Sequence, residues 1–193
     1  TVADLAAVAA TDCSSTSDTL RTAYGTAFDA WIAVSHLRFG PVEAEERGFA
    51  LAFWPDSRGA TPKALGTLIR DADPIAESAA AYDDMSIAAR GYYAMEFLLY
   101  DETISTAGDA AYRCQLTQTI AADIGNLTAA IAADWQNYAP LLTAPGPDGI
   151  YRTETEATQE LFKALTTGLQ LTSDARLGRP MGTFDNPRPR RAE

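Results

Sequence analysis

An unbroken helical period of apolar residues between Tyr112 and Tyr138 constrains the fold of this chain more than any other feature. The residues are Leu116, Ile120, Ile124, Leu127, Ile131, Trp135 and Tyr138, at steps of four, four, three, four, four and three. Because an α-helix has about 3.6 residues per turn, these side chains share one face. The period predicts a long amphipathic helix whose apolar face is covered by other elements.

Two further segments carry the same signal. Residues Ser17–Leu37 place apolar side chains three and four apart, and Gly40-Pro41 follows as a stop signal. Thr153 and Glu156 form a capping box that opens a final helix. The apolar positions are Leu20, Tyr24, Phe28, Trp31 and Val34 in the first helix and Leu161, Leu165 and Leu169 in the last.

Turn signals divide the middle of the chain. Thr61-Pro62 and Asp73-Pro74 each resemble an N-cap followed by the first helical residue, so two helix starts are expected. The second helix is predicted over Pro74–Tyr100, with a break near Asp83-Asp84, and its apolar end YYAMEFLLY indicates burial on all sides. Residues 49–59 (FALAFWPDSRG) are predicted to form a packed loop or a short helix.

Nothing in the chain alternates like a β-strand, so we predict an all-α fold. The expected architecture is an up-and-down helical bundle of four to five long helices with short loops. A chain of 193 residues suits one such domain over residues 1–193. Residues 183–193 are predicted to form an extended, basic, Pro-rich tail that carries Arg188, Arg190 and Arg191.

The charge and the hydropathy of the sequence argue against a nucleic-acid partner and against a transmembrane segment. The net charge of -11 repels phosphate backbones, so nucleic acid is not expected as a partner. No apolar run approaches the roughly 18 residues of a membrane span, so the chain is not expected to be transmembrane. Because the sequence around Thr1 has no signal-peptide pattern, we expect any signal peptide to have been removed.

Cys13 and Cys114 are the only cysteines. Their wide separation does not match zinc or thioredoxin-type motifs, and an even number suggests one disulfide. A disulfide would indicate an oxidising compartment such as the periplasm. Two independent buried cysteines are the alternative.

Familiar catalytic motifs are absent from the sequence. His36 is the only histidine, which excludes a zinc site built from several histidines of this chain. Glu96 is the unusual residue, because it is an acid inside the apolar run Tyr92–Tyr100. A carboxylate in dry surroundings requires a partner, a metal or a bound proton.

Tyr93 precedes Glu96 by three positions and Tyr100 follows it by four, so the three side chains share a helical face. This arrangement is compatible with a site of oxygen ligands for iron or a similar metal. A structural hydrogen-bond network is the alternative. Other charges beside aromatic or turn residues could pair with Glu96 or with another acid. The residues predicted to line the site are Arg38, Trp54, Asp56, Arg90 and Tyr100.

Four blocks resemble, in order, those of the imelysin family. They are HLRFGPV at 36–42, FWPDSRG at 53–59, ARGYYAMEFLL at 89–99 and RLGRPMG at 176–182, the last followed by PRPRRAE at 187–193. The resemblance implies an exported protein of the periplasm or outer membrane, built of two helical bundles and linked to iron regulation and uptake. It further implies that this chain is the N-terminal half of a longer protein.

The family's Gly-x-His-x-x-Glu motif, proposed to bind metal, corresponds to Gly91–Glu96, with Tyr93 in the histidine position. Three functions are therefore weighed. The first is an envelope protein that binds iron, another metal or a metal complex at Tyr93 and Glu96. Its partner would be the C-terminal half or an iron-transport component of the envelope. The second is a metallopeptidase, which needs more ligands than this half supplies. The third is a non-catalytic interaction module that uses Phe53-Trp54 for packing or docking.

Overall fold

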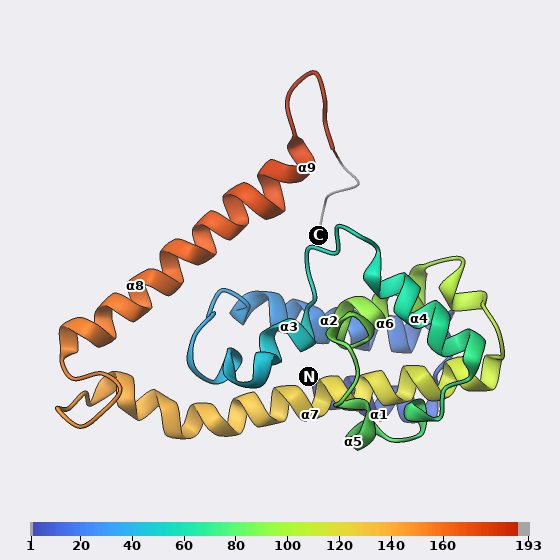
Figure 1. Ribbon diagram of the computed structural model, residues 1–193, viewed down its shortest axis with the longest axis horizontal. Coiled ribbons are helices and arrows are strands. Elements are labelled where there is room, and N and C mark those ends of the chain that lie inside the picture. The colour runs from blue at the N-terminus through green and yellow to red at the C-terminus, as the bar shows by residue number, and fades with distance from the viewer. Residues whose placement is uncertain (1, 189–193) are drawn as a thin grey trace. The chain divides into compact units, whose positions relative to one another are not determined.

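The computed structural model of the protein describes residues 2–188 and consists of helices and their connections (Figure 1). The helices are α1 (Val2–Thr11), α2 (Asp18–Val34), α3 (Arg47–Leu51), α4 (Ala60–Asp71), α5 (Ala79–Tyr82), α6 (Gly91–Tyr100), α7 (Ala110–Thr143), α8 (Glu154–Gln170) and α9 (Arg179–Met181). A π-helical stretch, Leu171–Gly178, joins α8 to α9. Residues 2–188 contain no β-strand, and the all-α prediction is confirmed.

The chain divides into two compact units. The first contains the residues up to Trp31 together with Glu45–Ile131, and the second contains Ile32–Ala44 together with the residues from Ala132 onward. Helices α2 and α7 each begin in the first unit and end in the second. The strong period predicted for α7 is confirmed, and Leu116, Ile120 and Ile124 are fully buried in the first unit.

In the second unit, α7 contributes aromatic side chains to a smaller cluster. The ring of Phe39 lies 5.5 Å from that of Trp135 and 6.1 Å from that of Tyr138. The hydroxyl groups of Tyr138 and Tyr151 are 2.6 Å apart. The second half of the long helix is thus packed by aromatic contacts rather than by an aliphatic core.

The prediction of one helix over Pro74–Tyr100 is wrong in its continuity, although a break does occur near Asp83-Asp84. The segment forms a 3-10 turn at Pro74–Glu77, then α5, a second 3-10 turn at Ile87–Ala89, and α6. Side chains of Asp73, Ser78 and Ser86 each accept a hydrogen bond from a backbone N–H two or three residues later. These local bonds satisfy the backbone in short turns and so compete with a continuous helix.

Helix α8 starts as predicted. Thr153 Oγ1 accepts from the Glu156 N–H at 3.2 Å, while the Glu156 carboxylate accepts from the Arg152 N–H instead of that of Thr153. The apolar stripe of this helix does not enter the core. Leu161, Leu165 and Leu169 are 48%, 52% and 62% exposed, and the buried residues of α8 are Ala157, Ala164 and Gly168.

The Cys13–Cys114 disulfide is confirmed and closes a loop with a sequence separation of 101. No helix within residues 2–188 has the length and apolar character needed to cross a bilayer. In the predicted tail, residues 183–188 are exposed, and Thr183 and Asn186 exchange two backbone hydrogen bonds. Arg190 and Arg191 lie outside the described residues.

Candidate functional site

Helix α6 begins at Gly91, the first residue of the motif segment, and its backbone there requires glycine. Gly91 has a φ of +73°, in the left-handed region that favours residues without a Cβ. A Cβ at this position would lie less than 3.0 Å from the carbonyl oxygens of Ala50 and Leu51 in the α3 region. The glycine therefore lets the start of α6 lie directly against the backbone of α3.

Tyr93 and Glu96 stand one turn apart on α6, but Glu96 is not in a dry interior. Glu96 is exposed, whereas Tyr93 is 9% exposed. Tyr100, four positions after Glu96, is 47% exposed. Because residues four apart share a helix side, Glu96 and Tyr100 form an outward strip, and the predicted burial of this helix on all sides is wrong. The buried residues of α6 are Gly91, Tyr92, Tyr93, Ala94, Met95, Leu98 and Leu99.

Side chains of α2 pack beside this strip. We call the combined surface the α2/α6 face; it consists of Arg21, Tyr24, Phe28, Tyr93, Glu96 and Tyr100. The ring of Tyr24 lies 6.1 Å from that of Tyr100, and the ring of Phe28 lies 5.8 Å from that of Tyr93. The Arg21 guanidinium lies 4.8 Å from the centre of the Tyr100 ring. Glu96 is therefore bordered by aromatic rings contributed by both helices.

Partial burial among these rings raises the pKa of Glu96 above its usual range, and no cation within residues 2–188 offsets the shift. The pKa of Tyr24 is also raised, first by its own burial and then by the negative charge of Glu96. Glu96 therefore acts on Tyr24 electrostatically across the two helices. Burial therefore disfavours the ionised form of Glu96 in the folded protein.

We expect Glu96→Gln to raise the melting temperature slightly at neutral pH. When folding raises the pKa of a carboxyl group, ionisation of that group lowers the free energy of unfolding. Glutamine cannot ionise, so the substitution removes this loss of stability. Below the ordinary pKa of 4.5, glutamate is protonated in both states, and the difference should vanish. Thermal unfolding of both proteins from acidic to neutral pH measures this. A loss of stability at neutral pH would show instead that an ion pair holds Glu96.

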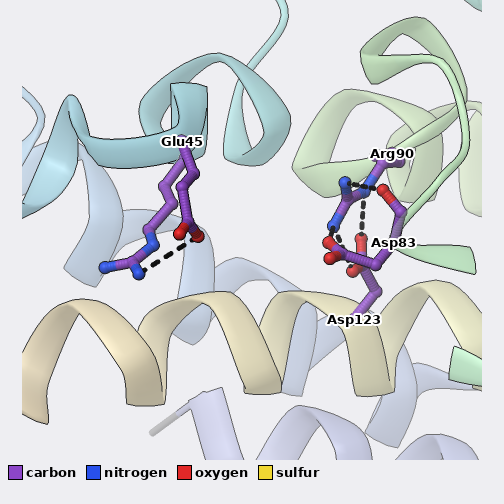
Figure 2. Close-up of polar contacts among 5 residues, drawn as sticks. Glu45, Asp83, Arg90 and Asp123 are labelled. Atoms are coloured by element: carbon purple, nitrogen blue, oxygen red, sulfur yellow. Dashed lines mark hydrogen bonds and ion pairs between the residues drawn. The ribbon is translucent and has the colours of Figure 1, made fainter. Parts of the chain in front are cut away.

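Arg90 lies directly before Gly91, with a side chain 6% exposed, and it binds two acids (Figure 2). Its Nε and Nη2 donate to the Asp123 carboxylate at 3.0 and 2.6 Å. Nη2 and Nη1 donate to the Asp83 carboxylate and carbonyl at 2.6 and 2.7 Å. Desolvation raises the pKa of Asp123 despite the adjacent guanidinium. Arg90 thus forms an ion-pair network with α7 that secures the start of α6, and its partners are Asp83 and Asp123.

A cavity of about 320 Å³ adjoins this network. Its polar lining consists of Glu45, Arg47, Asp83, Asp123 and Asn126. Glu45 pairs with Arg47 at 3.3 Å, and Figure 2 shows Glu45 apart from the Arg90 cluster. Glu45 and Glu46 have φ values of 53° and 57°, so the turn before α3 is strained. Because the lining charges pair with one another or with Arg90, we assign no ligand to this cavity.

The remaining predicted residues have other roles. The Asp56 carboxylate caps α4 by accepting from the N–H groups of Ala60 and Thr61 at 2.7 and 2.8 Å. Partial burial would raise the pKa of Asp56, but these hydrogen bonds outweigh it and lower the pKa. Arg38 pairs with Glu43 at 3.0 Å in the second unit. Trp54 lies in the loop between α3 and α4 and is half-buried.

The donor set does not suit a metal ion held by this chain alone. No three His, Cys, Asp or Glu side chains within residues 2–188 could hold a metal together. His36 lies in the second unit, where its Cβ would be 2.7 Å from a Cβ at Gly168. A zinc site needs three or four protein ligands, which the α2/α6 face lacks. Tyr93 and Glu96 could supply two oxygen ligands to a hard cation such as ferric iron.

Asp123 was not among the residues predicted from the sequence. This acid stands three residues after Ile120 and four before Leu127, on the apolar face of the predicted helix. An acid on such a face indicates a buried cation, so the signal was present. Its pairing with Arg90, which is 33 residues away, is a tertiary contact that the helical period does not reveal.

Comparisons with known proteins agree with the fold. Residues 1–193 match the imelysin family. The crystal structure of an imelysin-like protein from Psychrobacter arcticum 273-4 superposes with a TM-score of 0.74 at 20% sequence identity. The match covers 94% of this chain and 55% of that chain, so this chain spans about half the length of that protein. None of the curated proteins matches the chain. Because the family match extends over the full sequence, the chain belongs to the imelysin family.

Proposed function

We propose that this chain is a non-catalytic binding protein of the cell envelope that takes part in iron supply. The α2/α6 face is the binding surface, and Tyr93 and Glu96 are its ligands for ferric iron presented as a complex. One observation carries the proposal. Glu96 is exposed beside a phenol one turn earlier, and partial burial raises its pKa. A carboxyl group whose pKa is shifted by its surroundings is a candidate functional group.

Ferric iron held in a complex suits the α2/α6 face better than the bare ferric ion. Ferric iron is a hard cation that favours anionic oxygen ligands, and a phenolate and a carboxylate are two such ligands. The other coordination positions would be filled by the molecule that carries the iron. The exposed ring of Tyr100 and the half-buried ring of Phe28 offer apolar contacts to that molecule.

A metallopeptidase is the weaker candidate because of the donor set. Metal-assisted hydrolysis needs a metal held by several protein ligands with one position open for water. Tyr93 replaces the histidine that would provide the nitrogen ligand, and His36 lies in the second unit. The surface therefore suits binding better than hydrolysis.

The disulfide supports an exported location. Disulfides persist in oxidising compartments such as the periplasm, and Cys13 and Cys114 form one. We propose an iron-transport component of the envelope, or the remaining half of a longer imelysin-family chain, as the partner of this protein.

Calorimetric titration with ferric nitrilotriacetate tests the proposal. We expect the wild-type chain to bind the complex and both Tyr93→Phe and Glu96→Gln to weaken binding by at least about tenfold, or ~1.4 kcal/mol. Glu102→Gln is the matched control, because Glu102 is also exposed but lies after α6 and outside the α2/α6 face. Equal affinity in all four proteins would refute the assignment of these ligands.

An interaction module without metal chemistry is the second candidate. It is favoured by the exposed ring of Tyr100 and the half-buried ring of Phe28, which could dock an apolar partner as readily as an iron complex. In that case Tyr93→Phe and Glu96→Gln would leave the iron content of the protein purified from its native compartment unchanged.

A further inference from the structure

A cavity of about 380 Å³ lies beside the disulfide, within the first unit. It is lined by residues 11–15 at the end of α1 and by the first two turns of α7, and both Cys13 and Cys114 form part of its wall. We call it the disulfide cavity. Thr11 and Ser14 at its edge are exposed, so the cavity opens to solvent. Most of the lining residues carry hydroxyl or charged groups, which suits a polar ligand.

Arg113 supplies the positive charge of this cavity. Its Nη1 donates to the carbonyl oxygens of Ala107 and Gly108, the second at 2.9 Å, and these bonds orient the guanidinium. Its Nε and Nη2 have no hydrogen-bond partner among the described residues, and Arg113 pairs with no acid there. The Nε–Nη2 edge of an arginine presents two N–H groups that match two oxygens of an anion. Because Arg113 lines the cavity, this edge is available to an anion bound there.

Thr117 is an independent sign of a ligand. It lies one turn after Arg113 on the same side of α7 and lines the cavity, and it is only 3% exposed. Its hydroxyl nevertheless has no hydrogen-bond partner within residues 2–188. On the same helix, Thr119 donates to the carbonyl of Ala76, and Thr128 donates to that of Ile124 at 2.8 Å. A buried hydroxyl left unpaired costs free energy, and an oxygen of a ligand in the cavity would satisfy it.

Further donors surround the same space. Ser15 and Ser105 are half-buried lining residues whose hydroxyl groups have no partner in the part of the chain that the structure describes. Ala110, the first residue of α7, also lines the cavity, and its N–H is not hydrogen-bonded to any described residue, whereas that of Tyr112 is capped by Asp109 at 2.9 Å. The N-terminus of a long helix favours a bound anion.

We propose that the disulfide cavity binds a phosphate group, either free phosphate or the phosphate of a small ester. The guanidinium edge, the three hydroxyls and the Ala110 N–H offer more hydrogen bonds than the about four that a carboxylate accepts. The three terminal oxygens of a phosphate accept more. Asp12 does not oppose the anion with a free carboxylate, because its oxygens accept from the Ser14 N–H at 3.2 Å and the Ser17 hydroxyl at 2.5 Å.

Calorimetric titration of the oxidised 193-residue chain at constant ionic strength tests the proposal, with inorganic phosphate, glycerol 3-phosphate and acetate as probes. We expect a phosphate probe to bind more tightly than acetate, and the tighter of the two phosphate probes identifies the source of the group. Arg113→Gln and Thr117→Val should each weaken binding by at least about tenfold. Thr117→Val should leave the melting temperature of the ligand-free protein unchanged, because it removes no hydrogen bond within residues 2–188.

The controls change the same residue types outside the cavity. Thr128→Val lies on the same helix, and Arg70→Gln removes a positive charge from an exposed residue that pairs with Asp71. Both variants should bind phosphate as the wild type does. The proposal is overturned if the wild type binds neither phosphate probe, if acetate binds as tightly as phosphate, or if Arg113→Gln and Thr117→Val keep the affinity of the wild type.

Discussion

Gly91→Ala is expected to destabilise the protein by more than ~4 kcal/mol, an exceptionally large effect for removing no side-chain contact. A left-handed φ costs an alanine roughly 1–2 kcal/mol. The added Cβ would also overlap the carbonyl oxygens of Ala50 and Leu51, which belong to the backbone and cannot move as a side chain would. Either α6 or α3 must shift, and the Arg90 network beside them would be disturbed. Denaturant unfolding measures the loss.

Gly25→Ala is the matched control for that experiment. Gly25 lies in the interior of α2, and a Cβ there would meet nothing within 4 Å. Because alanine favours the helix by about 1 kcal/mol over glycine, this variant should be slightly more stable than the wild type. A Gly91→Ala protein as stable as Gly25→Ala would contradict the packing of α6 against α3.

Removal of the disulfide should produce the second large effect. The bond between Cys13 and Cys114 closes a loop of about 100 residues, for which the chain-entropy model gives up to ~4.7 kcal/mol. Cys13→Ser combined with Cys114→Ser should therefore lower the free energy of unfolding by about 4 kcal/mol. Helix α1 should separate first, since Leu5 and Ala9 are its only buried residues.

Reductant provides the control for the disulfide. Unfolding of the wild type in reductant should match that of the double serine variant, and the variant should not respond to reductant. Limited proteolysis should cut first after α1 both in the reduced wild type and in the double serine variant. Equal stability of the oxidised wild type and the variant would show that the loop closed by this bond does not limit stability.

The sequence predicted the elements whose signals are local and long. Helix α7 was predicted because its apolar period continues for about six turns, and α8 was placed by the Thr153 cap. The continuity of Pro74–Tyr100 was misjudged because the side chains of Asp73, Ser78 and Ser86 accept hydrogen bonds from nearby backbone N–H groups. Each of these bonds starts a new short helical turn, which a run of helix-forming residues does not reveal. Such short caps act over two or three residues and outweigh propensity there.

The candidate site was harder to predict. It depends on which side of each helix faces outward and on contacts between residues far apart in the sequence. The run Tyr92–Tyr100 is apolar in composition, but α6 has only ten residues and one side of it faces outward, so Glu96 is exposed. In α8 the large residues point outward and the small ones pack inside, the reverse of what hydrophobicity alone indicates. Close approach of neighbouring elements, not apolar character, selected the buried face.

Visible absorption spectroscopy tests the central claim, that Tyr93 and Glu96 hold ferric iron within a complex. Addition of ferric nitrilotriacetate to the wild-type chain should produce a phenolate-to-iron charge-transfer band. Tyr93→Phe should abolish the band, Glu96→Gln should weaken it, and Tyr100→Phe should retain it. Absence of the band in the wild type, or its persistence in Tyr93→Phe, would contradict the proposed site.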